Sequence, residues 1–426
     1  MNNLFFIQDT IAHKISFWLL GCFLIFLPFD FFYSEIILGC YAIHTFIHAG
    51  KISYKNLFSS DFFLISSLFL VGIVTGLYSN DKQESLNISS RQLALLLIPI
   101  LFSVNDFALE RYRIGLFKIF AYSCTLTVIY LYTDAIRTII YFNMPANSLF
   151  SFAFMNHNFS MPIGIHATYL SMYVAFSIVI FGYQVLNEDN KSKIIFYSCC
   201  MVLLSMALIQ LSSRAVLIAI LVIANVIFPY FMSGKKRIRY LVLSLIISTA
   251  GFYAIFHFDA YKLRFINELK EDLSGNVAVI ESTEPRIARW EATMELVMRS
   301  PVFGYGSGSE KKLLKEQYFK KRFYISYINE FNTHSEYLSF LLKAGIIGLM
   351  IYIYVLFRGF VIAWKNKDLL FAAFITLIAI VSVSENVLDL NKGIFFYSFF
   401  FSIFLLGKKK YARKQETHLK KEGNPV

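Results

Sequence analysis

Long runs of apolar residues recur along the whole chain and constrain its fold more than any other feature. Most runs hold about 17–25 residues, the length with which an α-helix crosses roughly 30 Å of hydrocarbon. Of the 426 residues, 57% are hydrophobic and only 16% are charged, whereas an average soluble domain is about 25% charged. The alternating strand pattern of an outer-membrane barrel is absent. The sequence therefore predicts an all-α polytopic membrane protein.

The apolar runs predict about twelve membrane-spanning helices. The predicted spans are 15–33, 34–49, 60–78, 91–104, 115–140, 163–186, 194–211, 214–232, 240–257, 335–357, 369–388 and 393–407. They divide the chain into an N-terminal transmembrane bundle (1–257), a long polar loop (258–334), three C-terminal spans (335–407) and a basic tail (408–426). A twelve-span transporter built from two halves would carry its long loop in the middle. A loop after the ninth span argues against that class.

The net charge of +12 follows the same division of the chain. Basic residues fall in the short loops on one side of the predicted topology and in the tail. The positive-inside rule predicts this pattern for the cytoplasmic side of a membrane. We therefore expect both termini to be cytoplasmic and the 258–334 loop to lie outside. The excess of positive charge does not indicate a nucleic-acid partner.

Three arginines are candidates for binding an anion. Arg214 stands between the seventh and eighth predicted spans, where a charge is costly and needs an explanation. It either clamps an anion in a polar cavity or reaches toward lipid headgroups. Arg286 and Arg289 lie just before Trp290 in "EPRIARWEATMELVMRS", which has the periodicity of an amphipathic helix. Arginine grips phosphate oxygens in a two-pronged geometry, but a solvated or headgroup-bound pair is equally consistent with this position.

Acidic residues near those arginines leave a further alternative open. Glu281, Glu284 and Glu291 could be salt-bridge partners of Arg286 and Arg289. Beyond them, Pro301 is expected to end the helix, and "GYGSG" at 304–308 to turn the chain.

The segment "NTHSEYLSFLLKAGIIGL" places His334 where a polar stretch meets the tenth predicted span. An imidazole there can exchange a proton near neutral pH, or it can be an interfacial polar residue. Glu336 and Lys343 follow on one helical face, about two turns apart and too distant for direct contact. Lys343 lies deep enough to need a partner or water. Gly345 and Gly348 are expected to let another helix approach closely.

Metal and nucleotide sites have no support in the sequence. His157 and His166 lack a third ligand with convincing spacing, and the cysteines form no metal-type pair. No Walker loop or zinc-protease motif is present, and "GYGSG" does not follow a strand. We expect no cofactor and no metal.

The histidine segment resembles a motif of the O-antigen ligase family, which also includes related O-antigen and exopolysaccharide polymerases. The family pattern is His, then Asn, Ser or Gln, nine residues, Gly, two residues, and Gly, Thr or Tyr. His334, Ser335, Gly345 and Gly348 match it completely.

Two upstream segments extend this resemblance. Arg286, Trp290, Pro301, Gly304 and Gly306 are similar to the family's Arg-x-x-x-Trp and Pro-x-x-Gly-x-Gly segments. "LSSRAVLIA", which contains the first candidate arginine, resembles the family's Ser-Arg segment. "ENVLDLNKGIFFYSFFFSIFLL" is similar to its last spans. The specific motifs cover roughly residues 205–405.

The resemblance implies a metal-independent glycosyltransferase of the bacterial inner membrane, with a periplasmic active site and a role in lipopolysaccharide or polysaccharide biosynthesis. Its donor would be a glycan linked to undecaprenyl diphosphate. Its acceptor would be lipid A–core or another glycan. Arg214 and Arg286 would bind the diphosphate, with Arg289 as a weaker candidate, and His334 would accept or orient the acceptor proton. Supporting positions would be Trp290, Glu336, Gly345 and Gly348.

The shared motifs leave the reaction open. A ligase would transfer the glycan to lipid A–core, whereas a polymerase would join lipid-linked repeat units. A polysaccharide or lipid transporter remains the third alternative.

Overall fold

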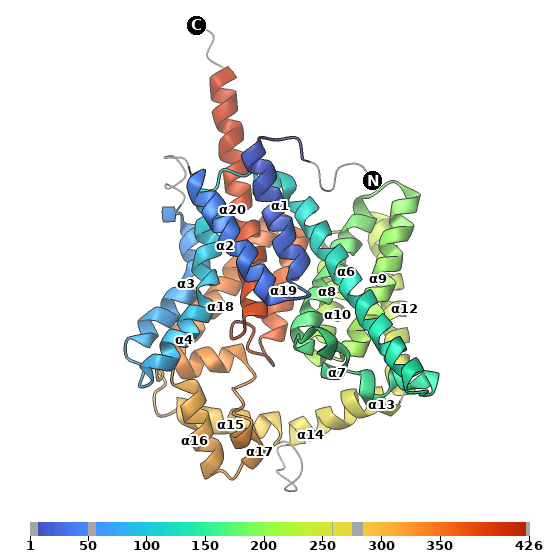
Figure 1. The fold of residues 1–426 in the computed structure, drawn as a ribbon, viewed down its shortest axis with the longest axis vertical. Coiled ribbons are helices and arrows are strands. Elements are labelled where there is room, and N and C mark those ends of the chain that lie inside the picture. The colour runs from blue at the N-terminus through green and yellow to red at the C-terminus, as the bar shows by residue number, and fades with distance from the viewer. Residues whose placement is uncertain (1–6, 50–56, 258, 275–283, 423–426) are drawn as a thin grey trace.

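The computed structural model describes residues 7–49, 57–257, 259–274 and 284–422. Within these ranges the regular structure is helical, which confirms the all-α prediction. Figure 1 shows a bundle of long helices with a group of shorter helices at one end.

The first half of the bundle follows the predicted spans closely. Its helices are α1 (Ile11–Phe26), α2 (Phe31–Ile47), α3 (Ser60–Gly76), α4 (Lys82–Gln92), α5 (Ala94–Val104), α6 (Leu109–Tyr141), η2 (Ala146–Phe150), η3 (Phe152–Phe154), α7 (His157–Ser160), η4 (Met161–Ile163), α8 (Ala167–Asn187) and α9 (Lys191–Leu211). Together α4 and α5 lengthen the fourth predicted span at its polar end, because Asp81 accepts a hydrogen bond from Glu84 N and caps α4.

The second half contains the long predicted loop. Its helices are α10 (Arg214–Val222), η5 (Ile223–Ile227), α11 (Phe228–Tyr230), α12 (Gly234–His257), α13 (Asp259–Lys262), η6 (Leu263–Asn267), α14 (Glu268–Ser274), α15 (Arg286–Val297), α16 (Glu310–Lys320), α17 (Tyr324–Ile328), α18 (Glu336–Lys365), α19 (Leu369–Val381) and α20 (Asn391–Glu422). The amphipathic helix expected around Trp290 is therefore present as α15.

Every predicted span overlaps a helix, but the number of membrane crossings remains a prediction. Among the described residues, five helical segments are long and apolar enough to cross a membrane: Lys82–Val104, Leu109–Tyr141, Ala167–Asn187, Lys191–Leu211 and Glu336–Lys365. Six shorter apolar segments accompany them: Ile11–Phe26, Phe32–Ile47, Ser60–Gly76, Arg214–Tyr230, Leu369–Val381 and Asn391–Gly407.

Helix α8 lies at the centre of the bundle. Nearly all its side chains from Ala167 to Gly182 are buried, as expected for a helix that is apolar on every side. Its ring of Phe176 contacts those of Phe374 and Phe400, with centroids 5.4 and 4.9 Å apart. These aromatic contacts fix α19 and α20 against α8, and with them the segment that joins α19 to α20.

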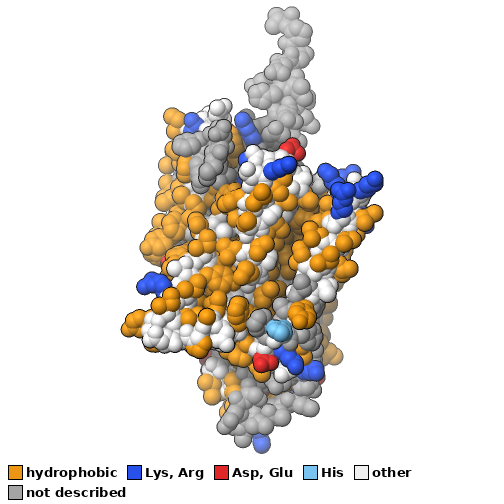
Figure 2. Space-filling model, turned by 90° about the vertical axis from the view of Figure 1, so that its right-hand side faces the viewer, with side chains coloured by type: hydrophobic (Ala, Val, Ile, Leu, Met, Phe, Trp, Pro, Cys, Tyr) orange, Lys and Arg blue, Asp and Glu red, His pale blue; other side chains and the backbone are white. Residues whose placement is uncertain are grey.

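The outside of the bundle is strongly apolar. On the face drawn in Figure 2, hydrophobic side chains cover the middle and charged side chains gather toward the two ends. Helix α12 lies at the edge of the bundle (Figure 1) and exposes apolar side chains, among them Leu245 and Ile246. This pattern is typical of a surface that faces lipid.

The helices of the predicted loop gather at the end of the bundle opposite the projecting C-terminal part of α20 (Figure 1). Helices α15 and α16 share a small core with the beginning of α18, formed by residues such as Ala292, Leu314 and Leu342. Glu284 fixes α17 by accepting hydrogen bonds from the backbone of Ile325 and Ser326. The loop segment is thus a packed cap.

A break in α18 holds this cap in place. Gly345 has φ +62° and ψ −163° inside the helix, which frees backbone groups on both sides of it. Tyr305 N donates to Leu342 O at 3.0 Å, and Ile346 N donates to Pro301 O at 2.9 Å. A Cβ at Gly345 would lie 2.1 Å from the carbonyl oxygen of Val302.

The expected role of the two glycines in helix packing needs correction. Gly345 admits the backbone of a loop, because its positive φ and missing side chain leave room for residues 301–306. Gly348 does face a neighbouring helix, since its nearest atom outside α18 belongs to Val71 of α3. The Pro-x-x-Gly-x-Gly segment and the first glycine of the histidine motif are therefore parts of one structural joint.

Candidate functional site

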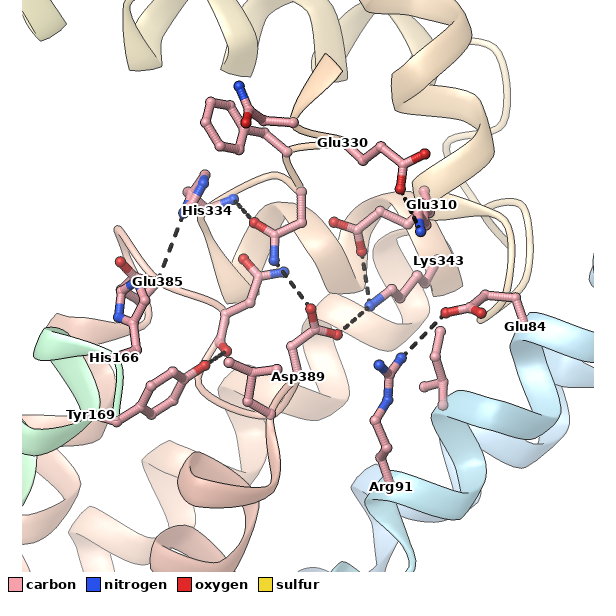
Figure 3. Close-up of a pocket in the computed structure, with 17 residues that line it drawn as sticks. Glu84, Arg91, His166, Tyr169, Glu310, Glu330, His334, Lys343, Glu385 and Asp389 are labelled. Atoms are coloured by element: carbon pink, nitrogen blue, oxygen red, sulfur yellow. Dashed lines mark hydrogen bonds and ion pairs between the residues drawn. The ribbon is translucent and has the colours of Figure 1, made fainter. Parts of the chain in front are cut away.

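A cavity of about 450 Å³ opens where the cap meets the bundle (Figure 3). Its walls come from α4, the start of α8, α16, the segment before α18 and the segment 382–390 between α19 and α20. Elements far apart in the sequence thus meet around one polar space. His334 lies on its wall, as do Glu385 and Asn386.

His334 occupies a constrained backbone position at this cavity. Its φ is +46°, a region that few residues other than glycine adopt. The side chain of Asn332 accepts a hydrogen bond from His334 N at 3.0 Å, and Trp290 Nε1 donates to Thr333 O at 3.0 Å. Backbone strain of this kind clusters at functional sites. Trp290 therefore supports the histidine through its backbone.

Glu385 is the acidic neighbour of this histidine. Its Oε2 lies 3.8 Å from His334 Nδ1 (Figure 3), and Thr168 Oγ1 donates to its Oε1 at 3.4 Å. Burial raises the pKa of the Glu385 carboxyl, but its interaction with His334 and the positive charge of Arg286 are among the effects that lower it by more. The group is therefore a carboxylate at neutral pH.

Glu336 ties the 382–390 segment to the start of α18. Its backbone N–H donates to Ser382 O at 2.9 Å, and its Oε2 accepts from Leu388 N at 2.8 Å. Because Glu336 is buried and bonded to this segment at both ends, its role is to fix the position of the cavity wall that carries Glu385.

Lys343 has the partner that its depth requires. Its ammonium lies 2.8 Å from Glu310 Oε2 and 3.8 Å from Asp389 Oδ1. Glu310 also accepts hydrogen bonds from Ser339 Oγ and Thr333 N. Burial raises the pKa of Glu310, but Lys343 and these hydrogen bonds lower it by more. This ionised pair fastens α16 to α18 just below the histidine.

Arg214 and Arg286 converge on one carboxylate beside the cavity. Asp272 Oδ2 lies 2.5 Å from Arg214 Nη2 and 3.8 Å from Arg286 Nε. Arg286 Nη1 also donates to Ser384 O at 3.4 Å, so it reaches the residue directly before Glu385. The structure thus brings together two arginines that are 72 positions apart in the sequence, and one of them contacts the segment that carries Glu385. Two adjacent guanidinium groups suit a diphosphate.

Arg289 lies apart from that pair. It is 94% buried, and its guanidinium carbon lies 5.1 Å from the centre of the Phe331 ring. Phe331 in turn contacts the His334 ring, with centroids 5.6 Å apart. Of the acidic residues expected near these arginines, Glu284 binds the backbone of α17, and Glu281 lies outside the described residues.

His157 and His166 meet at the far side of Glu385, with ring centroids 4.2 Å apart. Burial lowers the pKa of His166 to about 4, although Glu385 opposes this shift. Among the described residues, no group of three or more histidine, cysteine, aspartate or glutamate side chains could hold a metal ion. The pair is best described as a neutral wall next to the carboxylate.

Several residues of this site were not singled out from the sequence. Asp272 is one of several acidic residues in the long predicted loop and carries no local signal. Glu385, Asn386 and Asp389 fall in "SENVLDLNKG", a polar interruption between apolar runs that could have suggested a site. The predicted span 369–388 included the first two, whereas α19 ends at Val381.

Comparison with known families identifies one match. Residues 199–353 match the family model described as O-antigen ligase. This range contains Arg214, Arg286 and His334 and ends before Glu385. No curated protein matches the chain.

Proposed function

We propose that this chain, whose residues 199–353 match the O-antigen ligase family model, transfers a glycan from undecaprenyl diphosphate to a hydroxyl of lipid A–core. The observation that carries this proposal is that an imidazole on the cavity wall and an arginine pair beside that wall meet at the same segment, residues 384–385. His334 faces Glu385, and Arg286 binds the backbone directly before it.

The proposed reaction is a single displacement at the anomeric carbon. The acceptor oxygen forms a new bond to that carbon, and the bond from the carbon to the diphosphate oxygen breaks. His334 takes the acceptor proton as general base, and the leaving diphosphate keeps the bonding electron pair. A single displacement inverts the anomeric centre.

Arg214 and Arg286 are assigned to the leaving group. The charge that develops on it lies next to a low-dielectric boundary, where fixed cations stabilise a transition state most strongly. Asp272 offsets one of the two positive charges when no diphosphate is bound. The bound diphosphate would replace part of that interaction.

A polymerase that joins lipid-linked repeat units is the second candidate. One observation favours it: each lysine and arginine on the cavity wall lies next to a carboxylate. A wall of this kind suits an uncharged glycan, such as the end of a second repeat unit.

Reconstitution tests both candidates. The purified protein in detergent would receive an undecaprenyl-diphosphate-linked repeat unit, with and without lipid A–core, and products would be resolved by gel and mass. We expect glycan on lipid A–core with the unaltered protein and none with Arg286→Ala. A ladder of longer lipid-linked glycans without that acceptor would assign the protein as a polymerase. If neither product formed, the glycosyltransferase proposal would be wrong.

A further inference from the structure

Asn386 is a buried residue on the cavity wall with an unused hydrogen-bond donor. It is 98% buried. Its Oδ1 accepts a hydrogen bond from Thr333 Oγ1 at 3.2 Å, whereas its Nδ2 has no hydrogen-bond partner in the described part of the chain. Buried polar groups almost always have a partner. The Asn386 Nδ2 group is therefore available to donate a hydrogen bond to an oxygen atom of a molecule in the cavity.

A second buried nitrogen in the same wall has the same property. His334 Nδ1 lacks a hydrogen bond within the described residues, because Glu385 is 3.8 Å away. Thr333 connects the two positions, since it precedes His334 and bonds to Asn386. Alcohol groups suit both nitrogens, because an alcohol oxygen accepts from an amide and an alcohol proton can be given to an imidazole.

The charges of the cavity indicate what kind of molecule carries that alcohol. Carboxylates outnumber lysines and arginines by five to three among its lining side chains. The cations are already engaged: Arg91 lies 3.3 Å from Glu84, and Lys311 lies 2.6 Å from Glu330. A phosphate or carboxylate on the ligand would find no free cation among these side chains. An uncharged, hydroxyl-rich molecule would fit this wall.

We propose that this cavity is the acceptor subsite, that it takes an uncharged sugar at the end of the acceptor glycan, and that Asn386 donates a hydrogen bond to that sugar. This inference rests on the proposed glycosyl transfer. It separates the substrates: the diphosphate binds at the arginine pair, and the neutral sugar binds on the other side of Glu385. Asn386 is thereby a positioning and specificity-determining residue.

The test measures KM for each substrate separately in the reconstituted reaction. Asn386→Asp keeps the size and the oxygen of the side chain but removes the donor. We expect it to raise the acceptor KM about tenfold, the equivalent of one lost hydrogen bond of roughly 1.4 kcal/mol, and to leave the donor KM within about twofold. Asn386→Ala removes the donor without adding a charge and should shift the same constant. Asn366→Asp, at the far end of α18, is the matched control.

Three results would overturn the inference. An unchanged acceptor KM in both Asn386 variants would mean that the amide binds only water. An equal rise of both KM values would mean that it supports the fold. The third is inhibition by glucuronic acid or glucose 6-phosphate that equals or exceeds inhibition by neutral methyl hexosides. Absence of any transfer by the unaltered protein would instead refute the proposed function, and this inference with it.

Discussion

His334 and Glu385 face each other across the cavity wall with 3.8 Å between the imidazole nitrogen and the carboxylate oxygen. This distance is longer than a hydrogen bond, so the two side chains are close neighbours that are not hydrogen-bonded to each other. Catalytic hydrogen bonds are often long before substrate binds and shorten in the complex. In the proposed reaction, the carboxylate would stabilise the imidazolium that forms when His334 accepts a proton.

Glu385→Gln tests this relationship. The maximal rate should fall about 10²-fold, because the imidazolium loses its counter-charge, while donor binding stays unchanged. Initial rates of glycan transfer over a range of donor concentrations would show both effects. A maximal rate equal to that of the unaltered protein would contradict the relationship.

Asp272→Asn should tighten donor binding. Asp272 occupies Arg214 and Arg286 and therefore competes with a diphosphate for them. We expect the donor KM to fall about two- to fivefold, the equivalent of up to about 1 kcal/mol for a partly exposed pair. The acceptor KM should not change. A large rise in the donor KM would mean that Asp272 is needed to position the arginines.

Gly345→Ala should detach the cap from α18. The alanine would have to adopt the positive φ of this position, and its Cβ would clash with the carbonyl oxygen of Val302. The backbone strain alone costs about 1–3 kcal/mol. The unfolding temperature in detergent should fall clearly. Gly39→Ala is the matched control, because no atom lies within 4 Å of a Cβ at that position of α2. Equal unfolding temperatures for the two variants would contradict the claim that Gly345 attaches the cap to α18.

Lys343→Met should destabilise the protein by about 3–5 kcal/mol, because it leaves Glu310 buried without its cation. Adding Glu310→Gln should recover part of the loss, since no charge then remains unpaired. Chemical or thermal unfolding of both single variants and the double variant would measure this coupling. Strictly additive effects would show that the pair makes no joint contribution.

Acidification should destabilise the region around His166. The pKa of its imidazole in the folded protein, about 4, is below the ordinary value of about 6.5, so the unfolded chain binds the proton more readily. The stability that the neutral ring contributes is complete above about pH 6.5, and up to roughly 3 kcal/mol is lost as the pH falls toward 4. Unfolding temperatures of the unaltered protein and of His166→Gln at several pH values would test this. Parallel curves would contradict it.

Much of the helical content could be predicted from the sequence, because apolar runs of membrane length leave few alternatives. The helix α15 followed from the periodicity around Trp290. The ends of helices were less certain. Helix α19 ends at Val381, and the next residue, Ser382, accepts a hydrogen bond from Glu336 N at the start of α18. Such contacts form between distant parts of the chain, and the local periodicity of apolar residues does not predict them.

The sequence selects the motif residues of the candidate site but not the contacts between them. His334, Arg214 and Arg286 were selected by residue type and position. Asp272, which joins the two arginines, and Glu310, which pairs with Lys343, depend on how the cap folds back onto the bundle. The break at Gly345 was not predictable either, because the sequence pattern of a helix does not show that a loop from another part of the chain will pack into it.

The most direct test of the account is a single-turnover measurement with labelled undecaprenyl-diphosphate-linked glycan, comparing the unaltered protein with His334→Asn. Asparagine tolerates the positive φ of this position, so the variant should keep its fold and bind the donor. We predict that it transfers glycan about 10²–10⁴ times more slowly at full donor occupancy. Transfer at the unaltered rate would contradict the assignment of His334 as the base and, with it, the central claim about this cavity.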